Sequence, residues 1–231
     1  MPKKTIIVTG ASRGIGFATA RYLAGLKYRV LATARSRENL EKLQKHHPRR
    51  IEIVPCDLSN YSSIQQLVDY IRDNNLEISA IVHNAGQLVN KPHFELTDDD
   101  WNTMWSTNVM SAVRLMRVAL PFMGKGSHAV TIGSMGGYQG SSKFPGLAAY
   151  STSKGALSIW TECMAVELKE QGISVNCLCL GAVQTEMFST AHPGVKAPLS
   201  ANDIAEYIGD FVLKGHKFMN GQVLPVALGN P

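Results

Sequence analysis

The sequence predicts an α/β domain built on a doubly wound parallel β-sheet with helices on both faces. Short runs rich in β-branched residues alternate with helical patterns along the whole chain. The first run, at 5–9, is apolar, as expected for a strand that is buried on both faces of a sheet. No linker, repeat or low-complexity tract interrupts the alternation, so we expect residues 1–231 to form a single domain.

Each element follows from its local pattern. Strands are expected at 5–9, 29–33, 51–54, 78–82, 129–132, 173–180 and 222–226. Helices are expected at 15–26, 37–45, 59–74, 148–171, from 97 toward 121 with a break or bend at an undetermined point, and from 200 onward. Ser36 can cap the helix that begins at 37, and Ser200 with Asp203 resembles a capping box. The acidic residues of Thr97-Asp-Asp-Asp100 complement the dipole at the start of another helix. The carboxyl ends of the strands are the edge at which such sheets bind ligands.

The first turn at this edge is rich in glycine. Gly10, Gly14 and Gly16 lie between the first strand and the first helix. Glycines here permit a tight turn and a close approach of the backbone to a pyrophosphate at the helix N-terminus. The spacing is Gly-x-x-x-Gly-x-Gly, which differs from the general Gly-x-Gly-x-x-Gly dinucleotide pattern. The turn therefore predicts a dinucleotide site, with a purely structural turn as the alternative.

Tyr150 and Lys154 are expected on one face of a helix, because residues four apart in a helix are neighbours. A nearby ammonium favours the phenolate, so we expect the pKa of the tyrosine to fall from about 10 toward neutrality. Such a tyrosine can exchange a proton with a carbonyl or alcohol oxygen. A Tyr-x-x-x-Lys pair without catalytic role is the alternative, and the dinucleotide turn argues against it.

These motifs, together with 83–86, Asn108 and Ser134, resemble the short-chain dehydrogenase/reductase (SDR) family over essentially the whole chain. The resemblance implies a Rossmann fold and a nicotinamide cofactor. By this resemblance the phosphates lie against the glycine turn, the adenine meets the residues after the third strand, the adenosine ribose lies beside the fourth, and the carboxamide contacts the residues after the sixth. The residues so implied are Gly10, Ser12, Gly14, Ile15 and Gly16; Asp57 and Leu58; Asn84, Ala85 and Gly86; and Gly181, Val183 and Thr185.

The same resemblance implies the catalytic roles. Ser134 would hold the substrate oxygen while Tyr150 exchanges the proton, and Lys154 would bind the nicotinamide ribose as well as tune the tyrosine. Asn108 would anchor a water that relays protons to the lysine. His83 is expected to be structural.

Cofactor choice depends on the residues after the second strand. A carboxylate there selects NAD(H) by binding the ribose hydroxyls, but this chain has Ala34-Arg-Ser-Arg37. Arg35 offers a planar fork of donors to a 2′-phosphate, and Arg13 can reach the same group. We therefore expect NADP(H) rather than NAD(H), with two solvent-facing arginines as the alternative.

Three departures from the family pattern affect the substrate side. The stretch from Ser134 to Tyr150 is longer than usual, which makes Ser141 and Ser142 alternatives to Ser134. Leu180 stands where a proline is usual, and the segment 187–199 is short for a substrate lid. A short lid implies an open site, suited to bulky substrates or completed by a partner subunit.

Composition narrows the partners. The net charge is +5, and the basic cluster at 46–50 is expected in a solvated loop, so no nucleic-acid partner is predicted. No signal peptide or run of about 18 apolar residues is found, and the four cysteines have no metal-like spacing. We expect reduced thiols, no metal and a cytoplasmic protein. Segments 108–123 and 157–168 are apolar on more than one face, which predicts a partner helix, and the family resemblance implies that this partner belongs to a homodimer or homotetramer. Trp101 and Trp105 are expected in the core or at the interface.

The expected function is NADP(H)-dependent hydride transfer between the nicotinamide and a small carbonyl compound or secondary alcohol. One alternative is reduction of a 3-oxoacyl thioester on a carrier protein. Another, from a different class, is a non-catalytic scaffold that senses NADP(H).

Overall fold

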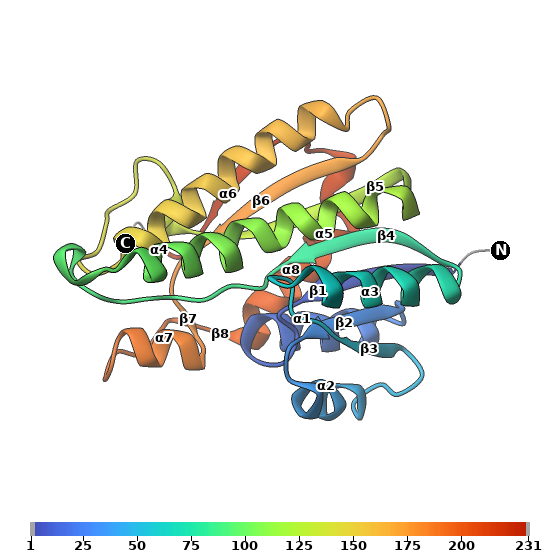
Figure 1. The fold of residues 1–231 in the computed structure, drawn as a ribbon, viewed down its shortest axis with the longest axis horizontal. Helices are drawn as coiled ribbons and strands as arrows, with labels where there is room; N and C mark the ends of the chain where they lie inside the picture. The colour runs from blue at the N-terminus through green and yellow to red at the C-terminus, as the bar shows by residue number, and fades with distance from the viewer. Residues whose placement is uncertain (1–2, 230–231) are drawn as a thin grey trace.

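A parallel β-sheet forms the centre of the computed structural model, which describes residues 3–229 (Figure 1). Its strand order is β3-β2-β1-β4-β5-β6-β9, and the neighbouring strands are parallel throughout. The strands are β1 (Lys3–Thr9), β2 (Val30–Ala34), β3 (Ile51–Pro55), β4 (Leu76–His83), β5 (Met123–Ser134), β6 (Ser174–Leu180) and β9 (Val223–Val226). This is the doubly wound, single-domain Rossmann architecture that the sequence predicts.

Helices cover both faces of the sheet (Figure 1). They are α1 (Gly14–Gly25), α2 (Arg37–Gln44), α3 (Tyr61–Asp73), α4 (Asp98–Trp105), α5 (Ser111–Ala119), α6 (Ala148–Glu167), α7 (Glu186–Ala191) and α8 (Ala201–Lys214). One apolar cluster joins α1, α2 and α8 to the sheet, and a second joins α3, α5 and α6 to the opposite face. The alternation of β1 explains both: Ile6 and Val8 lie in the first cluster and Ile7 in the second, all buried.

The predicted caps at Ser36 and Ser200 are present, and Thr97 is a further N-cap. Ser36, the N-cap of α2, accepts a hydrogen bond from the backbone N–H of Asn39. Thr97 and Ser200 each form a capping box with an aspartate three residues on, at the start of α4 and α8. These side chains satisfy backbone N–H groups that the first turn of a helix leaves free, and so fix where each helix begins.

The long helix predicted from 97 toward Pro121 is divided. Between α4 and α5 the chain makes a π-helical turn, Ser106–Met110. Such a turn inserts one residue into the helical repeat and re-aims the side chains beyond it. The helix predicted at 148–171 ends at Glu167, and three short elements were not predicted: α7 and the two-residue strands β7 (Val183–Gln184) and β8 (Leu199–Ser200).

The switch point of the sheet lies between β1 and β4, where the strand order reverses direction. Thr9 joins the two strand ends: its Oγ1 donates to Val82 O (3.2 Å) and accepts from the backbone N–H groups of Asn84 (3.0 Å) and Ala85 (2.9 Å). This fixed edge positions the loops that carry the predicted motifs. Among the described residues no helix is long and apolar enough to cross a membrane.

Candidate active site

A cavity of about 700 Å³ opens at the carboxyl edge of the sheet, between the glycine turn, the ends of β4, β5 and β6, and α7. Nearly all of the predicted site residues line it. These are Gly10, Ser12, Arg13, Gly14, Ile15, Arg35, Asp57, Leu58, Asn84, Ala85, Gly86, Ser134, Tyr150, Lys154, Gly181, Val183 and Thr185. Gly16 and Asn108 are predicted site residues that do not line it.

The glycine turn needs its glycines for two different reasons. Gly10 and Gly14 have φ angles of 63° and 57°, a left-handed conformation that residues with a Cβ rarely adopt. Gly16 is ordinary in φ, but a Cβ there would lie 2.4 Å from Asn84 Nδ2 and 2.5 Å from Gly10 O. Gly16 therefore lets α1 pack closely against the end of β4 and has no direct place in the cavity wall.

The N-terminus of α1 suits an anion. Arg13 is its N-cap residue, its side chain does not cap the helix, and the first turn contains no acidic residue. The backbone N–H groups of this turn therefore meet the cavity beside a positive dipole end. A close-fitting glycine turn, an uncapped helix end and a cavity of this size together fit the diphosphate of a dinucleotide.

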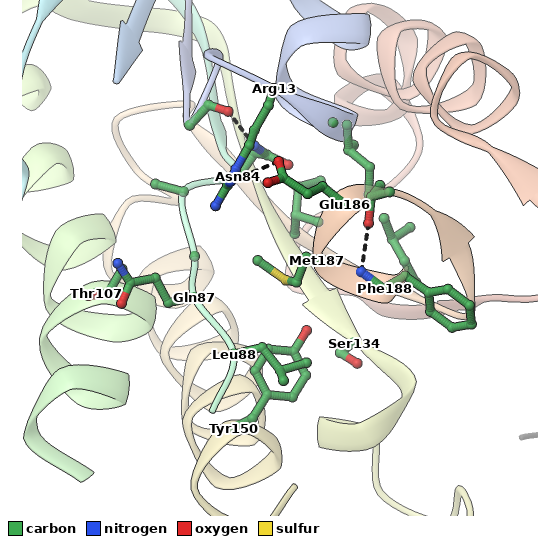
Figure 2. A pocket seen from close by; sticks show the side chains of 18 of the residues that line it. Arg13, Asn84, Gln87, Leu88, Thr107, Ser134, Tyr150, Glu186, Met187 and Phe188 are labelled. Atoms are coloured by element: carbon green, nitrogen blue, oxygen red, sulfur yellow. Dashed lines mark hydrogen bonds and ion pairs between the residues drawn. The ribbon is translucent and has the colours of Figure 1, made fainter. Parts of the chain in front are cut away.

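Arg13 is engaged with α7. Its guanidinium forms an ion pair with Glu186, the first residue of α7, at 2.8 Å, with both side chains largely exposed (Figure 2). Thr185, just before Glu186, lies against the glycine turn, because a Cβ on Gly14 would be 3.5 Å from Thr185 Cγ2. Arg13 thus links the glycine turn to α7 across the rim of the cavity, and its expected contact with a ribose phosphate stays a prediction.

Arg35 and Asp57 lie at the adenosine end. The acidic residue nearest after β2 in sequence is Glu38, which pairs with Lys42 and does not line the cavity. Asp57 accepts hydrogen bonds from the N–H and Oγ of Ser59 at 2.9 and 2.7 Å. Burial opposes ionisation, yet these hydrogen bonds and the charge of Arg35 hold the pKa of Asp57 below its usual value. The carboxylate of Asp57 is therefore held by hydrogen bonds to Ser59. Arg35 lines the ribose end of the cavity.

Ser134 is the serine next to Tyr150. It lies at the end of β5, where its Oγ accepts from the N–H of Gly136 (3.1 Å), and it is near enough to Tyr150 to act on the pKa of that phenol. Figure 2 shows both side chains facing the same space. The alternative Ser141 instead bonds to the backbone oxygens of Met135 and Tyr138 and does not line the cavity.

The expected fall in the pKa of Tyr150 is wrong for this structure. Burial raises the pKa of Tyr150 above 10.0, although the nearby Ser134 hydroxyl opposes the rise. Lys154 Nζ lies 5.9 Å from the centroid of the tyrosine ring and donates to Ile132 O at 2.7 Å. Burial also lowers the pKa of Lys154 to about 8. The helix places the pair on one face as predicted, but desolvation is the largest influence on both pKa values.

Asn108 positions a loop. It lies in the π-helical turn and is buried. Its Oδ1 accepts from the N–H of Gln87 (2.8 Å), while its Nδ2 donates to Gln87 O (3.0 Å) and Ser153 Oγ (2.9 Å). The carboxamide thereby ties the loop after β4 to the first turns of α6. Its predicted contact with a relay water stays a prediction.

Other predicted residues have structural surroundings. His83 is buried, packs edge-to-face on Trp160 with ring centroids 5.8 Å apart, and burial lowers its pKa to about 3. It is therefore neutral at physiological pH, as its expected structural role requires. Cys177 and Cys179 lie on one face of β6 with their sulfur atoms 3.8 Å apart, and the described cysteines are all free. Trp101 and Trp105 do not line the cavity.

The substrate side of the cavity was not predicted in detail. Its walls near Tyr150 are apolar and come from three segments: the loop after β4, the long loop before α6, and α7 with the residues that follow it. The residues are Leu88, Met135, Phe144, Leu147, Met187, Phe188, His192 and Val195. Figure 2 shows Leu88 beside the ring of Tyr150 and Met187 reaching into the cavity. These segments have no periodic pattern, so sequence alone gives no signal beyond their apolar content.

The arrangement can bind a dinucleotide and move a proton beside it. The glycine turn has a shape that suits phosphates at one end, and at the other a half-buried phenol near the Ser134 hydroxyl faces the same cavity as Lys154. A cofactor bound along the cavity would bring its reactive ring to the phenol, which is the requirement for coupled hydride and proton transfer.

Known proteins are similar to this chain in sequence and fold. A family profile described as short chain dehydrogenase matches residues 4–196. A 3-oxoacyl-[acyl-carrier-protein] reductase, FabG, of Escherichia coli is 30% identical over 208 residues, covering 89% of this chain and 84% of the relative. A fatty acyl-CoA reductase of Acinetobacter baylyi is 29% identical over 222 residues, covering 93% of this chain and 74% of the relative.

Among solved structures, a short chain dehydrogenase from Burkholderia cenocepacia in complex with NADP superimposes with a TM-score of 0.89 at 26% identity, covering 99% of this chain and 98% of that one. A 3-ketoacyl-(acyl-carrier-protein) reductase from Brucella melitensis, complexed with NADH, shares the fold with a TM-score of 0.88 at 21% identity, covering 99% of this chain and 98% of that one. The match of the family profile over most of the chain, together with the doubly wound sheet and the cavity at its carboxyl edge, shows that the protein belongs to the short-chain dehydrogenase/reductase family.

Proposed function

We propose that the protein is an NADP(H)-dependent oxidoreductase that transfers hydride between the nicotinamide and a carbonyl compound or secondary alcohol. The observation that carries the proposal is the meeting of Ser134, Tyr150 and Lys154 with the glycine turn in one cavity. A protein that only sensed the cofactor would need the turn but not a buried proton-transfer pair.

The mechanism assigns each side chain a step. The cofactor supplies the hydride, and Ser134 Oγ holds the substrate oxygen. Tyr150 donates its proton to that oxygen as negative charge develops. Because burial raises its pKa, the phenol is protonated at neutral pH and ready to donate in the direction of reduction. Lys154, fixed by Ile132 O, supplies positive charge beneath the phenol.

Arg35 supports NADP(H) as the cofactor. It lines the ribose end of the cavity, where Ser36 and Asn39 are neutral and Glu38 does not face the site. An arginine here complements a 2′-phosphate and has no partner of matching charge on an unphosphorylated ribose. The solved relatives include one complex with NADP and one with NADH, so the preference is a proposal about this chain.

We also propose a homodimer or homotetramer in a cytoplasmic setting. Trp105 on α4 and Ile159 and Val166 on α6 are exposed apolar side chains, which an associated subunit would cover. The free cysteines suit a reducing compartment.

The decisive experiment follows NADPH absorbance with ketones, aldehydes, diketones and acyl thioesters, each repeated with NADH and with Tyr150→Phe. We expect the variant to lower kcat/KM by about 10²–10⁴ while NADPH binds with an unchanged Kd, since the lost hydroxyl donates the proton. Tyr138→Phe is the matched control, because Tyr138 does not line this cavity.

Full activity of Tyr150→Phe would overturn the mechanism. Tight NADPH binding without turnover of any compound would favour the sensing scaffold. A thioester preferred over all free carbonyl compounds would favour the 3-oxoacyl-thioester alternative, which the names of the relatives support.

A further inference from the structure

The substrate side of the cavity is walled by segments that are bound to one another. Asn90, in the loop after β4, donates from Nδ2 to Ala191 O at 3.0 Å, which ties that loop to α7. Lys91 N donates to Gly146 O at 3.0 Å, which ties it to the long loop before α6. The wall near Tyr150 is therefore preformed by three linked segments, and its chemistry describes the space a substrate enters.

An aromatic group spans two of these segments. The ring of His192 lies between Phe144, with centroids 6.3 Å apart, and Phe188, with centroids 4.9 Å apart. These separations are those of favourable aromatic contacts. Phe144 is 42% exposed although it lines the cavity, so apolar surface remains available there. A flat apolar group entering beside Leu88 would bury this surface.

The apolar wall itself, formed by Leu88, Met135, Phe144, Leu147, Met187, Phe188, His192 and Val195, carries no lysine, arginine, aspartate or glutamate. Within residues 3–229, the lysines and arginines that line the cavity are Arg13, Arg35 and Lys154. Arg13 pairs with Glu186, Arg35 lies at the ribose end, and Lys154 is held by Ile132 O beneath the tyrosine. A carboxylate or phosphate on the substrate would thus lose its hydration without gaining a cation, which is a large cost.

We propose that the substrate is a neutral carbonyl compound with an aromatic or similarly broad apolar group beside the C=O, which packs against Leu88, Phe144 and Phe188. The proposal rests on the proposed function and narrows its substrate class. It disfavours keto acids, whose charge has no partner, and small ketones, which leave the aromatic wall exposed to water.

Four α-keto compounds test charge and size separately: methyl benzoylformate, benzoylformate, methyl pyruvate and pyruvate, each with NADPH. We expect kcat/KM for methyl benzoylformate to exceed that for benzoylformate and that for methyl pyruvate by about tenfold each, and pyruvate to be the poorest. Equal rates for the ester and the acid, or for the phenyl and the methyl compound, would overturn the proposal. So would an acetoacetyl thioester that surpasses methyl benzoylformate.

Variants at Phe144 and Phe188 test whether these aromatic side chains cause the substrate preference. Phe144→Ala and Phe188→Ala should each reduce the preference for methyl benzoylformate over methyl pyruvate by about fivefold, because each removes apolar contact with the phenyl group. Phe144→Leu and Phe188→Leu remove the ring but keep a large apolar side chain, and they guard against loss of folding. Phe94→Ala, at a phenylalanine that is 86% exposed and outside the cavity, is the control. An unchanged preference in both alanine variants would overturn the proposal.

The outcomes also distinguish a failure of the proposed substrate class from a failure of the proposed oxidoreductase function. Tyrosine-dependent reduction of a thioester or keto acid alone would refute the substrate class and leave the oxidoreductase standing. Turnover that survives Tyr150→Phe would refute the proposed mechanism whatever the substrate. NADPH binding, followed by its fluorescence, shows in every variant that the cofactor end is intact.

Discussion

At the residue scale, burial rather than mutual charge sets the protonation of Tyr150 and Lys154. The sequence places them on one face of a helix, and the structure confirms it. Their pKa values nevertheless move apart from what spacing alone predicts: the phenol is raised and the ammonium is lowered to about 8. Desolvation disfavours whichever form carries charge; Lys154 is buried, and Tyr150 is half-buried where it lines the cavity. Depth of burial is a tertiary property that no local spacing reports.

Arg35→Ala tests cofactor choice. We expect the Kd for NADPH to rise about 10- to 100-fold and that for NADH to change less than about twofold, because charge-assisted hydrogen bonds to the extra phosphate are lost. Titration of cofactor fluorescence measures both constants.

The matched control for Arg35→Ala is Arg37→Ala, since Arg37 lies on α2 outside the cavity. A similar loss for NADH and NADPH would contradict a phosphate contact and point to a general electrostatic effect.

At the element scale, α7 and the glycine turn face each other across the cavity rim. They are joined by the ion pair of Arg13 with Glu186, which the sequence could not predict because the two residues are far apart in the chain. An exposed ion pair is weak and is screened by salt. Arg13 is therefore free to exchange Glu186 for an entering phosphate.

Glu186→Gln should tighten NADPH binding about three- to tenfold, because the change removes a negative charge at the rim and frees Arg13. The gain should be smaller for NADH and should shrink at 0.5 M salt. Isothermal titration of each cofactor at two salt concentrations measures these effects.

Glu162→Gln, an exposed acid on α6 outside the cavity, is the control for Glu186→Gln. Weaker binding in Glu186→Gln would show instead that the ion pair holds α7 over the bound cofactor.

The elements themselves show what sequence can predict. All seven strands of the sheet were expected, because strands buried on both faces have continuous apolar patterns, and the caps at Ser36, Thr97 and Ser200 mark helix starts by short-range chemistry. The glycine turn and the pair Tyr150 and Lys154 could be predicted because their patterns, like those of the caps, lie within a few residues of sequence. The short α7, the aromatic wall and the role of Asn108 in binding Gln87 depend on contacts between distant segments, which leave no periodic trace.

At the scale of the whole molecule, two buried histidines link stability to pH. His83 has a pKa lowered to about 3 by burial, and His128 one lowered to about 4 by burial. His128 is neutral because its Nδ1 donates to Val212 O (3.0 Å) and its Nε2 accepts from Asn176 Nδ2 (2.9 Å). The unfolded chain binds protons at these histidines near pH 6.5, and the folded chain does not, so acid favours unfolding.

We expect the free energy of unfolding to fall by about 1.4 kcal/mol per buried histidine between pH 7.5 and 5.5. Over that interval each histidine becomes protonated in the unfolded state and stays neutral in the folded state. Urea unfolding at each pH measures it. His83→Phe, which can keep the edge-to-face contact with Trp160, should lose its share of the pH dependence.

An unchanged slope in His83→Phe would contradict the assignment of this pH dependence to His83. His93→Phe is the control, since His93 is exposed and its side chain can meet water in both states.

The π-helical turn has a consequence for how this chain can tolerate change. One extra residue at Ser106–Met110 shifts the angular phase of everything beyond it by about 100°, the angle between successive residues of an α-helix. Deleting a single residue from α4 would keep the asparagine, the loop it binds and every catalytic group in the chain. It would still rotate α4 and α5 relative to each other, so that one of the two helices would no longer pack correctly against its neighbours. The aim of Asn108 is thus encoded in the count of residues before it as much as in its identity.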